Sequence, residues 1–222
     1  MEASENAAVE QKIISKHSLS QYIYDRLLDK FQRNELVPGN ILNRREIAQE
    51  FGVSVAPVLE ALLQLEMEGF VESIPRKGTI VKPIREEDVF GQLMLREAVE
   101  CQAALLYCGE KVRTKRNELS VLAEKLEQSE PDAPDHWQED IIFHRTLVAL
   151  SECPALVREY DRLIHLSNFY QMNRILVPMD YMERRNHLEL IAQLEIDDPD
   201  HAMKAIREHL RSGKQHLFKD RI

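Results

Sequence analysis

The chain has 222 residues, of which 44% are hydrophobic and 30% are charged, and its formal net charge is −9. This composition is typical of a globular protein of one or two domains, and the lack of any apolar run of about 18 residues excludes a membrane-spanning helix. The acidic balance argues against non-specific coating of nucleic acids. Residues 1–16 lack the apolar core of a signal peptide, so we expect a disordered leader on a cytoplasmic protein.

Three helical patterns follow the leader. Apolar residues at intervals of four predict a helix from Ser18 to about Asn34. Asn43 and Glu46 have the spacing of a capping box, which predicts a short helix over 44–50. Ser54 is in position to cap a third helix that ends at Gly69 and has a core stripe of Val58, Ala61, Leu62 and Leu65.

The pattern then changes to that of strands. Residues 70–74 and 79–81 read as two strands joined by a tight turn. Three helices and a β-hairpin wing make a winged helix-turn-helix domain, which we assign to residues 17–82. In such a domain the second helix of the motif enters the major groove of DNA, here the helix that starts at Ser54, and Arg76 and Lys77 on the wing reach phosphates or the minor groove. The alternative is a winged helix that contacts proteins.

The second half of the chain reads as helical throughout. After a linker at 83–87, residues 88–222 show no strand pattern. Helical periodicity, broken by glycine and proline, predicts an all-α bundle of six helices, over 87–108, 114–128, 136–151, 155–174, 180–195 and 199–218. The fold class is therefore mainly α.

Four residues of this half have the chemistry of a metal site. Asp140 and His144 are four residues apart and project to one side of a helix, while His187 and His209 stand mid-helix on the apolar faces of two later helices. One carboxylate and three imidazoles suit a divalent metal, zinc first, with nickel, manganese or iron as alternatives, and leave coordination positions open for a ligand. Each histidine alone would more often be an ordinary core residue.

The N-terminal half resembles the GntR family of bacterial repressors. The resemblance covers about residues 20–82 and is carried by Val37-Pro38-Gly39, Glu46-Ile47-Ala48, Phe51-Gly52-Val53-Ser54, Pro57-Val58, Glu60-Ala61-Leu62 and Glu68-Gly69-Phe70-Val71. It implies an operator-binding domain. Arg45 matches a DNA-contact position of the family, but Val55 and Leu59 stand where the family usually has arginines.

These departures change the DNA contacts that we expect. Val55 and Leu59 donate no hydrogen bonds, although they are suited to touch thymine methyl groups. Phosphate contacts are expected from Ser54, Arg44 and Arg45, with Arg76 and Lys77 on the wing. We therefore expect an operator that is bound more weakly, or is richer in A·T pairs, than is usual in the family.

The C-terminal half resembles the FCD effector domain of FadR-type GntR regulators, in its shorter, VanR-like branch. The resemblance rests on Leu95-Arg96-Glu97-Ala98-Val99-Glu100, on Asp140 to His144, and on His187 and His209-Leu210. It implies that Asp140 and the three histidines bind a divalent metal and that Arg96 faces the effector cavity, so we assign Arg96 as a clamp for a small carboxylate.

Together these patterns predict a transcription regulator, not an enzyme. It would act as a repressor or activator, bind a palindromic operator as a homodimer, and respond to a small carboxylate effector held at the metal. Two alternatives remain open. One is a metal-dependent enzyme that acts on small acids, for which Glu100 is a candidate general base, and the other is an interaction module that has lost DNA binding.

Overall fold

The structure, a computed structural model, describes residues 19–129, 136–172, 186–212 and 214–218, and the expected leader at 1–16 lies outside them. It divides into two compact units, Met1–Ile84 and Arg85–Ile222. The division falls within the predicted linker, whose last two residues already form the first turn of a helix. None of the described helices is long and apolar enough to span a membrane.

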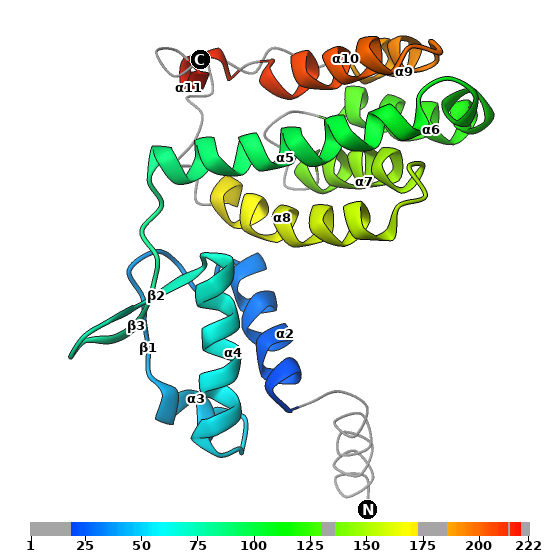
Figure 1. Cartoon of the computed structure of the whole chain (residues 1–222). Helices are drawn as coiled ribbons and strands as arrows, with labels where there is room; N and C mark the ends of the chain where they lie inside the picture. Colours follow the sequence, from blue (N-terminus) through cyan, green and yellow to red (C-terminus); the bar gives the residue numbers. More distant parts are fainter. Residues whose placement is uncertain (1–18, 130–135, 173–185, 213, 219–222) are drawn as a thin grey trace, which may run out of the picture. The chain divides into compact units, whose positions relative to one another are not determined.

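The N-terminal unit contains three helices and a small sheet (Figure 1). In chain order its elements are α2 (Leu19–Gln32), β1 (Ile41–Leu42), α3 (Arg44–Glu50), α4 (Val55–Glu68), β2 (Val71–Ile74) and β3 (Gly78–Val81). The strands are antiparallel in the order β1-β3-β2, with Ile41 opposite Ile80 and Val71 opposite Val81. The sheet thus has one strand more than the predicted hairpin, because the two-residue strand β1 is too short to show a period.

Local capping explains why the predicted ends of α3 and α4 agree with the structure. The side chain of Asn43 accepts the amide of Arg45, and Gly69 takes the left-handed conformation that closes α4. Ser54 occupies the N-cap position but its side chain makes no capping bond, contrary to expectation. The predicted stripe of α4 is buried and, with Phe31 and Phe70, whose rings lie 5.0 Å apart, forms the core of this unit.

The C-terminal unit is a bundle of helices. Its elements are α5 (Glu86–Tyr107), α6 (Glu110–Gln128), α7 (His136–Ala149), α8 (Pro154–Met172), α9 (His187–Leu194), α10 (Pro199–Arg211) and α11 (Gln215–Phe218). The long helix α5 packs against α7, α8 and α10, while α6 packs against α7 and α9. Each long helix contributes to one continuous apolar core, so the helices that carry the candidate ligands are fixed against one another.

Three predicted helices of this unit differ from the observed ones by more than two residues. The helix expected over 114–128 begins at Glu110, directly after its N-cap residue Gly109. The helix expected over 180–195 begins only at His187, because Asn186 caps it by accepting the amide of Glu189, and residues 180–185 lie outside the described part. The helix expected over 199–218 ends at Arg211, since Ser212 leaves the helical region (ψ 133°), and the four-residue α11 follows as a seventh helix. The apolar periodicity of the sequence continues past Asn186 and past Ser212, so it did not indicate the start of α9 or the end of α10.

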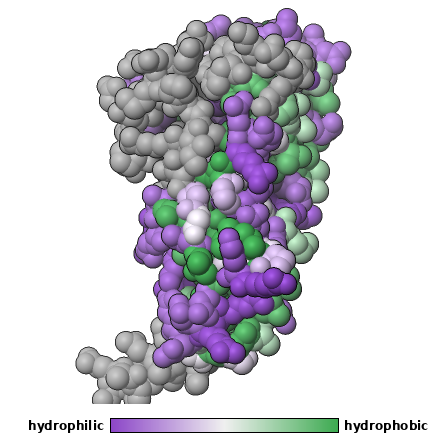
Figure 2. Space-filling view, turned by 90° about the vertical axis from the view of Figure 1, so that its left-hand side faces the viewer, coloured by the Kyte–Doolittle hydropathy of each residue, from purple (hydrophilic) through white to green (hydrophobic). Residues whose placement is uncertain are grey.

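The surface of the molecule is mixed. On the face drawn in Figure 2, polar side chains surround smaller groups of apolar side chains, including some on the N-terminal unit in the lower half of the view. Exposed large apolar residues occur on the described helices of both units, among them Val55, Leu63 and Met67 on α4 and Leu95 and Leu106 on α5.

Candidate functional site

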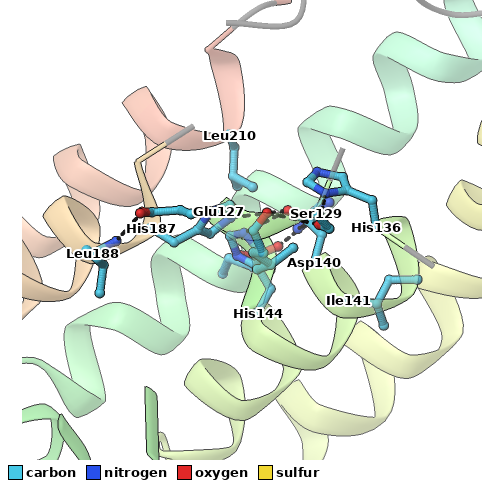
Figure 3. Close-up of polar contacts among 12 residues, drawn as sticks. Glu127, Ser129, His136, Asp140, Ile141, His144, His187, Leu188 and Leu210 are labelled. Carbon is cyan, nitrogen blue, oxygen red and sulfur yellow. Dashed lines mark hydrogen bonds and ion pairs between the residues drawn. The ribbon is translucent and has the colours of Figure 1, made fainter. Parts of the chain in front are cut away.

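Three buried histidines meet inside the C-terminal unit. His144 lies on α7, His187 is the first residue of α9, and His209 lies near the end of α10; they are 0%, 3% and 8% exposed. Figure 3 shows His187 reaching toward His144 and Asp140 from the neighbouring helix. The start of α9 is held by Glu127 on α6, which accepts the amide of Leu188 at 3.3 Å. The structure thus places His187 at a helix terminus and not mid-helix as predicted.

The donor atoms of this cluster are close enough to share one ion. One ring nitrogen from each histidine lies within 4.8 Å of the others. Oδ1 of Asp140 is 3.6 Å from Nε2 of His144 and 3.4 Å from Nε2 of His187. Two ligand atoms that each lie about 2.1 Å from a tetrahedral metal are roughly 3.4 Å from each other. The distances of the carboxylate to His144 and His187 match this spacing, and the ring nitrogens of the three histidines lie near it.

Glu100 on α5 orients the imidazole of His144. Its Oε2 lies 2.6 Å from Nδ1 of His144, and both side chains are buried. Burial alone would raise the pKa of Glu100, but Arg96 and His144 lower it to about 2, so the carboxylate is ionised and Nδ1 must carry the proton. Nε2 of His144 is then left with a lone pair, and it is buried without a hydrogen-bond partner among the described residues. Carboxylates hold metal-binding histidines in this way.

Arg96 is buried between two carboxylates. Its Nε donates to Glu100 at 2.5 Å and its Nη2 donates to Asp140 at 3.3 Å, and the side chain is 2% exposed. Burial opposes the charged form of this guanidinium, but the two carboxylates raise its pKa and keep it ionised. The sequence predicted Arg96 as a clamp for a small carboxylate, and in the structure its guanidinium donates to the carboxylates of Glu100 and Asp140.

The residues present fit a divalent cation. Both nitrogens of His187 are buried without a hydrogen-bond partner in the described part of the chain, which is costly unless something else binds them. Burial lowers the pKa of His144, which favours the neutral imidazole that a metal requires. With neutral imidazoles, Arg96, Glu100 and Asp140 leave one net negative charge. A divalent cation would reverse it, and one monoanionic ligand would then neutralise the site.

The sequence offers Glu100 as a candidate general base for the alternative in which the protein is an enzyme. In the structure both of its oxygens are engaged, and its low pKa makes it a weak base. The sequence did contain a signal for its true contact, because Arg96 and Glu100 stand four residues apart on one helix. The contact with His144, across 44 positions of sequence, follows only from packing.

The predicted DNA contacts all lie in the N-terminal unit. Arg45 is exposed on α3, and its neighbour Arg44 donates to Oγ1 of Thr79 at 3.3 Å. Arg76 and Lys77 are exposed at the turn between β2 and β3, where Arg76 has a positive φ of 67°. At the start of α4, Ser54 and Val55 are exposed and Leu59 is half-buried.

Comparisons with known proteins give a family match for each half of the chain. Residues 19–81 match the profile of the gntR family of bacterial regulatory proteins, and residues 92–212 match that of the FCD domain. The chain is 24% identical over 210 residues to the HTH-type transcriptional repressor RspR of Escherichia coli (strain K12), covering 91% of this chain and 90% of that protein.

Two solved structures share the fold. A GntR transcriptional regulator from Rhodococcus sp. RHA1 is 20% identical with a TM-score of 0.66, and the match covers 93% of this chain and 100% of that one. E. coli McbR/YncC is 20% identical with a TM-score of 0.62, and the match covers 91% of this chain and 98% of that one.

Proposed function

Since the chain belongs to the GntR family of bacterial regulatory proteins and carries an FCD domain, it is a DNA-binding transcription regulator, and we propose that a small carboxylate bound at a divalent metal controls its affinity for operator DNA. The observation that carries this proposal is the buried cluster of His144, His187 and His209 beside Asp140. Its donor set favours zinc, with nickel, manganese or iron as alternatives. The VanR-like branch stays a prediction.

A carboxylate is the effector class that the charges favour. A divalent ion gives the site one net positive charge in a buried environment, where an unbalanced charge is costly. Three imidazoles and one carboxylate also leave coordination positions open on most of these metals. Arg96 is the candidate clamp, because it could exchange Oδ2 of Asp140 for an effector oxygen. Binding would shift the arrangement of the domains and so change DNA affinity.

The proposal is tested with purified full-length protein and a panel of sugar acids, dicarboxylates and hydroxy acids. We expect about one metal per chain by elemental analysis, and at least one acid that raises the melting temperature only when metal is present. The same acid should change the affinity for DNA from upstream of the gene in a gel-shift assay. Stabilisation that persists after chelation and in Arg96→Lys would contradict the mechanism, because neither the metal nor the planar guanidinium would then matter.

We also propose that the protein acts in the cytoplasm as a homodimer on a palindromic site, since one winged helix offers little contact area. The exposed face of α5 supports this, because it is uncharged and carries Leu95 (52% exposed), Ala98, Gln102 and Leu106 (47% exposed). Light scattering should give twice the chain mass of 25.9 kDa. A single-chain mass at micromolar concentration would refute the dimer.

A further inference from the structure

Helix α4 carries no positive charge. Its 14 residues include no Lys or Arg and three glutamates, although α4 is the helix that the motif places against a polyanion. Two of the glutamates are used internally. Glu66 accepts the amide of Ser73 at 2.7 Å and its hydroxyl at 2.9 Å, and Glu68 accepts the hydroxyl of Tyr24 at 2.5 Å. Glu60 is exposed and is the one carboxylate of α4 that faces solvent.

The exposed side of α4 is instead a row of apolar residues. Val55, Leu59, Leu63 and Met67 follow one another at intervals of four and so lie along one side of the helix. Val55 is 42% exposed, Leu63 49% and Met67 80%. Val55 and Leu59 occupy the first two turns, whereas Met67 lies about 18 Å further along the axis. In a helix-turn-helix the N-terminal residues of this helix contact the base edges, so Val55 and Leu59 are the part of the row expected to reach the bases.

The cations of this unit that we expect to bind DNA lie on the elements next to α4 and not on the row itself. Arg44 and Arg45 open α3, and Arg76 and Lys77 occupy the turn of the wing. The bond from Arg44 to Thr79 ties α3 to β3, and the bonds from Glu66 to Ser73 tie α4 to β2, so these cations and the row belong to one rigid frame. Phosphates can thus be bound at the edges of a surface whose centre is apolar.

We propose that Val55 and Leu59 recognise the C5-methyl groups of thymines in the major groove of the operator. This inference rests on the proposed regulation of operator DNA and assigns its bases. The side chains that read guanine through O6 and N7 are Arg and Lys, which α4 lacks, and the amide of its Gln64 is given to Glu68. Thymine offers the one apolar group of the groove, and Glu60 can accept from the amino group of cytosine or adenine.

The test removes the methyl groups and nothing else. A duplex is selected from a random-sequence library with the full-length protein and then synthesised with thymine or with deoxyuracil, which has the same pairing and charge. We expect affinity to fall by about fourfold for each contacted methyl that is lost, the effect of burying one methylene-sized group. The double variant Val55→Ala/Leu59→Ala should bind both duplexes equally, whereas Met67→Ala, on the same row but out of reach, should discriminate as the wild type does.

Three results would overturn the inference. Equal binding of the two duplexes by the wild-type protein would show that the methyl groups are not read, while operator binding itself would stand. A selected site whose contacted positions are guanines would show direct reading by other side chains. If Val55→Ala/Leu59→Ala lowers the mass measured by light scattering, the row binds a second copy and not DNA. Failure to select any duplex would instead count against the regulatory function itself.

Discussion

Glu100→Gln is the substitution that most directly tests how the residues of the proposed metal site are organised. Glutamine keeps the size of the side chain but has one oxygen and one NH2 group, whereas Glu100 accepts from both Arg96 and Nδ1 of His144. If the oxygen stays with Arg96, the NH2 group faces Nδ1 and forces the proton onto Nε2, which then cannot bind a metal. If the amide is reversed, the NH2 group faces the Nε donor of Arg96, and two hydrogen-bond donors then oppose each other.

Either arrangement should lower the metal affinity of the proposed site, by an amount that can be estimated. Loss of the carboxylate that orients a metal-binding histidine typically lowers metal affinity by about 10–100-fold. We expect this loss for zinc in a competition titration with a chromophoric chelator at about pH 7.5. Because Arg96 is buried, the free energy of unfolding of the metal-free protein should also fall, so circular dichroism must first show that the variant is folded.

Glu97→Gln provides the matched control. Glu97 is also a buried glutamate of α5, but its carboxylate accepts from Arg207 and Arg211 on α10, at 3.0 and 2.7 Å, and not from a histidine of the cluster. The substitution should reduce stability while leaving the zinc affinity of the folded protein within a few-fold of wild type. The reasoning would be refuted if Glu100→Gln bound zinc as tightly as wild type, or if both variants lost affinity equally.

Further predictions concern stability, acid sensitivity and DNA. Gly109→Ala should lower the free energy of unfolding in urea denaturation by about 1–3 kcal/mol, because φ is +79° and the new Cβ would lie 1.6 Å from Oδ1 of Asp197. Gly91→Ala is the control and should be neutral or stabilising, because a Cβ there meets open space. Equal effects of the two substitutions would contradict this reasoning. Burial lowers the pKa of His144 in the folded protein, so below the ordinary histidine pKa of about 6.5 the unfolded chain binds one more proton than the folded chain. The melting temperature of the metal-free protein should therefore fall as the pH falls below about 6.5. A melting temperature that does not change over this pH range would contradict the prediction. Arg45→Ala should weaken operator binding and make its salt dependence shallower by about one unit of slope, and no change would show that the contact surface lies elsewhere.

Sequence patterns predicted the elements whose ends are set locally. The bounds of α3 and α4 follow from Asn43 and Gly69, residues whose capping acts within one turn. The start of α9 and the end of α10 were missed because the apolar period runs past both breaks, although Asn186 and Ser212 end the helical geometry there. Strand β1 was missed because its partner β3 is distant in sequence.

In the candidate site, too, the sequence predicted some features and not others. Asp140, His144, His187 and His209 could be named because each was expected on the inward face of a helix. The structure brings the three histidines together and places Asp140 beside His144 and His187. The contact of Arg96 with Asp140 could not be found, because it depends on α7 lying beside α5. A residue type and a helical face predict that a charged group points inward, but not which buried partner it meets.

The buried triad of Arg96, Glu100 and Asp140 also constrains how this protein can evolve. Removing one member of a buried ion pair leaves an uncompensated charge and typically costs about 3–5 kcal/mol, whereas replacing the whole set with apolar residues can be neutral. Single substitutions at these positions should therefore be rare in descendants of this chain. A lineage in which this triad is lost is expected to exchange all three residues in close succession, and intermediates that retain only one or two of them should be short-lived.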